Sequence, residues 1–291
     1  MKPSAFTYHA PHTLAEALDL VATLDNARVL AGGQSLLPMM NYRVVQPEHL
    51  IDLGRIPELG FVEATPDGLA IGAMTAQRTI ERSAIVQEHC PLLIDALFHV
   101  GHQQTRNRGT IGGSLCHLDP SAELPVTACA LDAVLTAASK TSRRKIAFAD
   151  FPAGYLTSSL EPNEILVRID FGKWPPRAGS AFEEYAVRPA DFAIVSVAAV
   201  VAIGEDDIIT EVRLAAGGIA PAPMRLATAE ALLKGERASA ALIERAAEAA
   251  AALPADGDEM NPSEYRQELA GHLTQRALTK AIERAQESVR A

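Results

Sequence analysis

The chain has 291 residues, of which 48% are hydrophobic, and it carries a formal net charge of −10. This length and composition predict a substantial core divided over two or three domains. The acidic balance argues against nucleic acid as the main partner, because phosphate backbones bind basic surfaces. No apolar run approaches the roughly 20 residues that a membrane-crossing helix needs, so we expect no membrane span.

The chain has three cysteines, at Cys90, Cys116 and Cys129. They show no close pairing, they are too few for the four ligands of an iron–sulfur cluster, and their spacing is not that of a zinc site. They are therefore interpreted as reduced thiols. Because the N-terminus also lacks the apolar core of a signal peptide, we expect a cytoplasmic protein.

Residues 1–56 are predicted to form a small α/β unit. Thr13 and Glu16 have the spacing of a capping box, and the apolar residues after Thr13 recur on one helical face. Residues 28–31 are typical of a short strand, and residues 49–53 of another.

Residues 57–173 form the second predicted unit. Thr75 is expected to cap one helix, and Pro91 to begin another that ends near Gly101. Strands are expected at residues 69–72, 134–137 and 164–171.

Residues 172–179, with Trp174-Pro175-Pro176, are typical of a linker, so a third domain is predicted over residues 177–291. Two apolar stretches should pair as a hairpin, at residues 193–203 and 208–216. Helices are then expected at residues 224–234 and 240–253 and after Asn261. Strands followed by alanine-rich helices favour a separate α+β domain.

Two glycine-rich segments lie about eighty residues apart, Ala31-Gly32-Gly33-Gln34-Ser35 and Thr110-Ile111-Gly112-Gly113-Ser114, and each is expected to form a loop. Glycine leaves backbone amides bare, and rows of amides bind anions. One such segment alone is more often a plain turn. Two of them in one chain favour a pyrophosphate held from both sides. The Gly-x-Gly-x-x-Gly and P-loop patterns are absent from the sequence, so neither a Rossmann nor a P-loop site is expected.

Charged residues flank the second glycine segment. Arg106 and Arg108 could neutralise phosphate, or could form a solvated or subunit-contacting face; the sequence leaves both readings open. His117 and Asp119 have no nucleophile to serve, so a catalytic pair is disfavoured. Asp119 and Glu123 are better interpreted as acceptors for cofactor hydroxyls or amines.

Three motifs together resemble the FAD-binding medium subunit of molybdenum hydroxylases, the group that includes carbon monoxide dehydrogenase and xanthine dehydrogenase-type enzymes. They are Ala31–Leu36 with Pro38-Met39-Met40, Arg106–Leu115, and Asp119–Pro125. The resemblance extends over essentially the whole chain. It implies an α+β protein with a two-subdomain FAD-binding region (vanillyl-alcohol-oxidase-like, PCMH-type) and a C-terminal α+β domain of antiparallel sheet and helices.

The resemblance also implies which residues hold FAD. The first segment, which wraps the pyrophosphate, is Val29, Leu30, Ala31, Gly32, Gly33, Gln34, Ser35 and Leu36, and the second, which closes on it, is Thr110, Ile111, Gly112, Gly113 and Ser114. The site is completed by the acidic residues Asp119 and Glu123, by Leu166 on a strand, and by Asp191 and Phe192 in a C-terminal loop. Phe192 would lie near the flavin ring, the alternative being a core aromatic at a strand start. Glu183 stands where xanthine dehydrogenases have a basic residue, so it is not expected to contact FAD.

By the same resemblance the chain is an electron-transfer subunit with no catalytic side chain of its own. A large molybdopterin subunit and a small [2Fe–2S] subunit would supply electrons, and FAD would pass them to an external acceptor. A quinone or cytochrome is favoured over NAD. Two copies of each of three chains are expected. Two alternatives stay open: a self-contained FAD-dependent oxidoreductase, and an adaptor that has lost its flavin.

Overall fold

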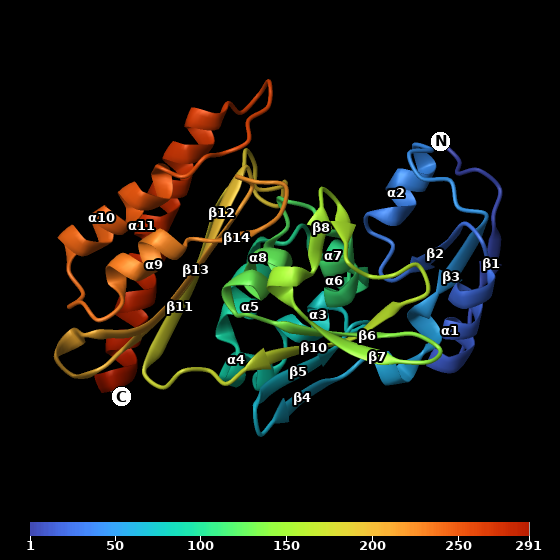
Figure 1. Ribbon diagram of the computed structural model, residues 1–291, viewed down its shortest axis with the longest axis horizontal. Helices are drawn as coiled ribbons and strands as arrows, with labels where there is room; N and C mark the ends of the chain where they lie inside the picture. Colours follow the sequence, from blue (N-terminus) through green and yellow to red (C-terminus); the bar gives the residue numbers. More distant parts are fainter. Residues whose placement is uncertain (291) are drawn as a thin grey trace.

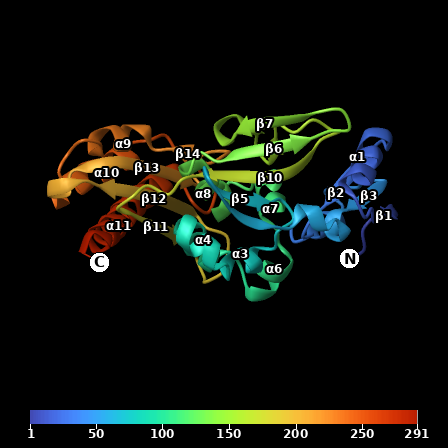
Figure 2. The same ribbon diagram turned by 90° about the horizontal axis from the view of Figure 1, so that it is seen from below.

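The computed structural model describes residues 1–290, with the side chains of residues 205, 289 and 290 excepted. Three regions follow one another along the long axis, from the N-terminal region in blue to the C-terminal region in orange and red (Figure 1). The view from below shows the same order (Figure 2). Within residues 1–290, no helix is both long and apolar enough to cross a membrane.

The N-terminal region is a three-stranded parallel sheet with two helices. Its strands lie in the order β1-β3-β2, and its elements are β1 (Thr7–His9), α1 (Leu14–Thr23), β2 (Ala27–Leu30), α2 (Leu36–Asn41) and β3 (His49–Asp52). The capping prediction is confirmed, because the Glu16 amide donates to Thr13 Oγ1 at 3.2 Å. Glu16 in turn accepts from the amide of His12 at 2.8 Å.

The middle region is a five-stranded antiparallel sheet in the order β4-β5-β10-β6-β7. Its strands are β4 (Val62–Thr65), β5 (Gly68–Gly72), β6 (Val134–Ala138), β7 (Arg143–Ala147) and β10 (Ile165–Gly172), with a ribbon of β8 (Pro152–Gly154) and β9 (Thr157–Ser158). Six helices join β5 to β6: α3 (Gln77–Glu81), α4 (Ala84–His89), α5 (Pro91–His99), α6 (Gln103–Arg108), α7 (Ile111–His117) and α8 (Glu123–Ala130). Helices α3, α4, α6 and α7 lie on one side of the sheet (Figure 2).

Two expectations for this region were wrong. Thr75 does not cap a helix: its hydroxyl donates to Phe61 O at 2.8 Å and accepts from the Phe61 amide at 3.1 Å, while α3 starts after Ala76 without a side-chain cap. The second glycine segment is not a loop, because Thr110 is the N-cap of α7 and Gly112, Gly113 and Ser114 are helical. The predicted helix from Pro91 is confirmed as α5.

The C-terminal region is a four-stranded antiparallel sheet in the order β11-β12-β13-β14, followed by helices. Its elements are β11 (Ala178–Tyr185), β12 (Val195–Ile203), β13 (Ile209–Gly217), β14 (Met224–Arg225), α9 (Ala227–Leu233), α10 (Ala240–Ala251) and α11 (Ser263–Arg290). The predicted hairpin is confirmed as β12 and β13. Helices α10 and α11 lie along the outer side of this sheet (Figure 1), and α5 and α8 pack against it from the middle region.

The sequence missed β11, which occupies the end of the predicted linker and the residues after it, so the connection shortens to residues 173–177. The helix predicted from Met224 begins only at Ala227, because Met224 and Arg225 pair with β13. One hydrophobic cluster runs through the middle region and includes Phe182, Ala198 and Val200 of the C-terminal sheet. These two regions therefore share a core, and the three domain boundaries stay a prediction.

Candidate cofactor site

The first glycine segment connects the end of β2 to the start of α2. Gly33 has φ +73°, the left-handed conformation that glycine adopts without strain. Within residues 1–290, no hydrogen bond uses the backbone N–H of residues 32, 33, 34, 35 or 36 as its donor. Five consecutive unpaired amides around a left-handed residue form the type of concave nest that binds anions.

The backbone amides of the second glycine segment already donate hydrogen bonds within the protein. The Ile111 amide donates to Thr75 O at 3.2 Å, and the Gly112 amide to Ala73 O at 2.9 Å. The Gly113 amide donates to Thr110 Oγ1 at 3.1 Å. The expectation that both segments present bare amides is therefore wrong for the second one. This segment contributes close backbone approach and the half-buried side chain of Ser114.

The two glycine segments contact each other. A Cβ on Gly32 would lie 2.2 Å from Arg108 O, and a Cβ on Gly113 would lie 3.2 Å from the Cβ of Ala31. The contact at Gly32 requires glycine, because a side chain there would clash with backbone atoms. The nest is therefore held directly against the start of α7.

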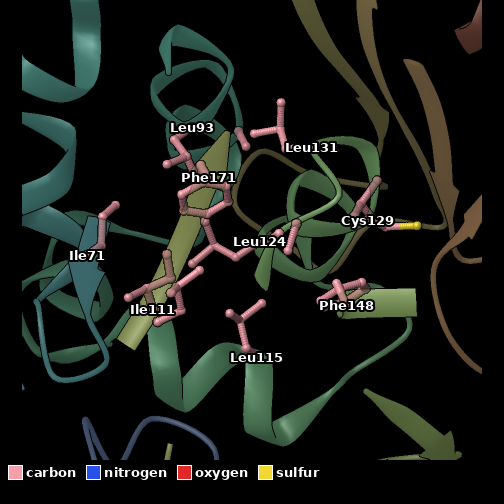
Figure 3. Close-up of a cluster of buried hydrophobic side chains, with 14 of the residues drawn as sticks. Ile71, Leu93, Ile111, Leu115, Leu124, Cys129, Leu131, Phe148 and Phe171 are labelled. Atoms are coloured by element: carbon pink, nitrogen blue, oxygen red, sulfur yellow. The ribbon is translucent and has the colours of Figure 1, made fainter. Parts of the chain in front are cut away.

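Helix α7 is fixed in place by its apolar side. Ile111 and Leu115 point into the core cluster that also holds Leu124 and Phe171 (Figure 3). A Cβ on Gly112 would lie 2.6 Å from Ala73 O, so this end of the helix rests on the turn after β5. Packing of this kind positions the site on a rigid element.

The structure separates the two arginines whose roles the sequence left open. Arg106 donates to Val100 O at 2.8 Å and to Gly101 O at 2.9 Å, and its Nε lies 3.1 Å from Glu81 Oε2. Because of these bonds the Arg106 guanidinium stabilises the fold and is not available to an anion. The Arg108 side chain is exposed and has no hydrogen bond or ion pair within residues 1–290. It remains the arginine beside the nest that is free to meet an anion.

Asp119 and Glu123 lie where α7 and α8 meet the C-terminal sheet. Asp119 Oδ1 accepts from the Ser121 amide at 2.9 Å, and its Oδ2 is 4.0 Å from His117 Nε2. Glu123 is only 8% exposed, and burial, reinforced by Glu184 and Asp119, raises the pKa of its carboxyl to about 8. At neutral pH Glu123 is therefore mostly protonated, and it can donate a hydrogen bond as well as accept one.

Leu166, Asp191 and Phe192 lie in three different environments. The Leu166 side chain is buried in the core, so only its backbone is available to a cofactor. Asp191 Oδ2 lies 3.2 Å from Arg188 Nε in the loop between β11 and β12. Phe192, in the same loop, is 73% exposed. The alternative of a core aromatic is thereby excluded for Phe192.

Adjacent glutamates of β11 have opposite surroundings. Glu183 Oε2 lies 2.8 Å from Arg276 on α11, and Glu183 also pairs with Lys280. Glu184 Oε1 lies 3.3 Å from His99 Nδ1 on α5. The sequence analysis did not single out Glu184 or His99. Strand alternation would have separated the two glutamates, but it applies only once β11 has been identified.

The comparisons with known proteins decide the family. Residues 4–174 match the model of the FAD binding domain in molybdopterin dehydrogenase, and residues 180–281 match the CO dehydrogenase flavoprotein C-terminal domain. The chain belongs to the FAD-binding medium-subunit family of molybdenum hydroxylases.

Several relatives of this FAD-binding subunit match over nearly the full length of both chains. The 6-hydroxypseudooxynicotine dehydrogenase complex subunit alpha of Paenarthrobacter nicotinovorans is 36% identical over 287 residues, 98% of this chain and 97% of the relative. The carbon monoxide dehydrogenase medium chain of Hydrogenophaga pseudoflava is 36% identical over 284 residues, 97% and 98% of the two chains. The solved quinoline 2-oxidoreductase from Pseudomonas putida 86 superposes with a TM-score of 0.93 at 35% identity, covering 98% of this chain and 99% of that one.

The fold class and the flavin cofactor predicted from the sequence are thereby confirmed, and the chain is an oxidoreductase subunit that uses FAD. The site fits that cofactor chemically. A diphosphate needs hydrogen-bond donors and positive charge, which the free amides of residues 32–36 and the exposed Arg108 can provide.

Proposed function

We propose that this subunit carries FAD with its pyrophosphate on the amides of residues 32–36, as the electron-transfer subunit of a molybdenum hydroxylase. The observation that carries the proposal is the nest of unpaired amides held against the start of α7. Buried or half-buried amides without partners are rare in proteins, and a ligand with phosphate oxygens would satisfy them.

The remaining site residues would act around that anchor. Arg108 would oppose the phosphate charge, and Ser114 would offer a hydroxyl, while the buried Thr110 caps α7 through its own hydroxyl. Asp119 and Glu123 would bond polar groups of the cofactor farther along α7, toward the C-terminal sheet. The exposed Phe192, in the loop that Asp191 helps to set, would lie over the flavin ring. The proposed set is Val29, Leu30, Ala31, Gly32, Gly33, Gln34, Ser35, Leu36, Thr110, Ile111, Gly112, Gly113, Ser114, Asp119, Glu123, Leu166, Asp191 and Phe192.

When bound, FAD supplies the redox chemistry, because it can accept electrons and pass them on. The protein's part is to hold the cofactor, limit its contact with bulk water and set its potential through nearby charge and dipoles. No side chain of this chain needs to act as acid, base or nucleophile toward a substrate.

The partners follow from the same proposal. The relatives are named as a medium chain or as one subunit of a complex. We infer a large partner with the molybdopterin cofactor and a small partner with two [2Fe–2S] clusters, two copies of each chain, and a cytoplasmic assembly. Electrons would leave FAD for an external acceptor such as a quinone or cytochrome. The molybdenum subunit would select the substrate.

The experiment that tests this proposal is an absorption spectrum of the native assembly, followed by a denaturing gel of the same sample. Flavin bands with iron–sulfur absorption and two further chains, one large and one small, support it. Flavin bands from a single chain would instead favour the self-contained FAD-dependent oxidoreductase, and turnover of a small substrate by that chain would establish it. A colourless single chain would contradict both.

A further inference from the structure

The short connection between β10 and β11, residues 173–177, lines a cleft of about 560 Å³. The turn between β4 and β5, the end of α4 and the last turn of α11 complete the lining. The connection lies at the end of the middle region away from the N-terminal region (Figure 1 and Figure 2), and none of the residues assigned to FAD lines the cleft. The cleft is therefore separate from the cofactor site, and its volume is in the range of small-molecule sites.

Backbone packing holds the walls of this cleft in place. A Cβ on Gly68 would lie 2.2 Å from Phe171 O, so the turn between β4 and β5 is packed directly against the end of β10. Pro175 is buried, and the Arg177 carbonyl accepts from the Ile203 amide at 3.2 Å. Arg177 also has φ +54°, a left-handed conformation that residues other than glycine rarely adopt. The connection is therefore held in one conformation by its neighbours, and the cleft is preformed.

The cleft combines one aromatic ring with unpaired cations. Trp174 packs against the large core cluster, and its remaining surface lines the cleft. Its chain neighbour Lys173 and the nearby Arg177 are exposed, and His89 is half-buried. None of these three side chains has a hydrogen bond or ion pair among the side chains that the structure describes. Among the described residues, Glu88 is the only acid in the lining, so positive charge is in excess here although the chain has a formal net charge of −10.

This combination favours one class of ligand. An indole ring packs well against another planar ring, and ammonium and guanidinium groups bind phosphate or carboxylate. An apolar ligand would leave the two cations unpaired, and an inorganic anion would leave the ring uncovered.

We propose that the cleft binds a small organic anion that carries a planar ring. Trp174 packs against the ring, and Lys173 and Arg177 bind the anionic group. This site goes beyond the proposed function and does not depend on it, because the cleft shares no residue with the FAD site.

The test uses the intrinsic fluorescence of the full chain. Trp174 is its only tryptophan, so tryptophan emission reports directly on the cleft. The chain is first saturated with FAD and then titrated with AMP, a probe that joins a planar ring to a phosphate. We expect a saturable change in tryptophan emission without release of FAD. Adenosine and inorganic phosphate each lack one of the two interactions, so each should bind about 10- to 100-fold more weakly than AMP.

Variants assign the two roles. Lys173→Gln and Arg177→Gln should each weaken AMP binding by about 10-fold or more. Arg143→Gln is the matched control, because Arg143 is an exposed arginine of β7 outside the cleft, and it should bind AMP as the wild type does. Trp174→Leu removes the ring, so its weaker binding is measured by calorimetry. If Trp174→Leu does not fold, the two charge variants still decide the question.

Several results would overturn the inference: no saturable response to AMP, equal binding of AMP and either of its two parts, or wild-type affinity in both charge variants. A response that follows the release of FAD would place AMP in the FAD site and would also overturn it. A chain that binds no FAD would contradict the proposed function instead. The same titration and variants would then still test the cleft, so the two failures are distinguishable.

Discussion

Replacing Gly33 tests the anion nest most directly, because this residue sets the left-handed turn at φ +73°. A Cβ there would meet only the ends of flexible side chains, at 3.0 Å from Leu37 Cδ1 and 3.3 Å from Leu30 Cδ1. Steric overlap is therefore minor, and backbone strain dominates. A non-glycine residue in this conformation costs about 1–2 kcal/mol. If the loop relaxes without ligand and must be restored on binding, that cost weakens FAD affinity by about 5- to 30-fold.

We expect Gly33→Ala to lose affinity in this range and Gly33→Val, which is β-branched, to lose more. Gly33→Asn should lose least, because asparagine tolerates the left-handed region. The assay is quenching of flavin fluorescence as FAD is added to the apoprotein. Gly172→Ala is the control, since a Cβ there meets no atom within 4 Å. Unchanged affinity in Gly33→Ala, or an equal loss in Gly33→Asn and Gly33→Val, would refute the argument from backbone conformation.

Three further predictions follow from the site. Arg106→Ala should lower the free energy of unfolding by about 1–3 kcal/mol in urea titrations, because it removes the donor to the part-buried carbonyls of Val100 and Gly101. Arg108→Ala should leave stability nearly unchanged but weaken FAD binding. Equal effects of the two substitutions would contradict the different roles assigned to these arginines. Phe192→Ala should retain FAD and stability while altering the flavin spectrum or its reoxidation rate, and an unchanged spectrum and rate would remove Phe192 from the ring site. Because the folded-state pKa of Glu123 is raised to about 8, its stabilising contribution is complete below its ordinary pKa and is lost as pH rises through 8. Glu123→Gln should therefore flatten the pH dependence of the melting temperature between about pH 5 and 9, and a profile identical to wild type would show that Glu123 does not titrate there.

The sequence by itself determined those features that depend only on neighbouring residues, such as helix caps, hairpins and glycine-rich segments. The capping box at Thr13, the apolar hairpin of residues 193–203 and 208–216, and the two glycine segments are all readable from neighbouring residues. The motifs also identified the family and its flavin, which the comparisons confirm. Short-range patterns carry this information because caps, turns and strand alternation depend on a few adjacent residues.

Only the tertiary structure decided how those features are used. The Ile111 and Gly112 amides are satisfied by Thr75 and Ala73, about forty residues away, and the Gly113 and Ser114 amides by Thr110, so the first segment alone presents a free nest. Strand β11 was missed because its Glu183-Glu184 pair lacks the pattern of an apolar strand, and its glutamates are compensated by partners on α11 and α5. The side chain of Arg106 bonds to Val100, Gly101 and Glu81, whereas that of Arg108 is exposed and has no partner within residues 1–290. Long-range pairing determines these outcomes, and a single sequence does not display the partners that create it.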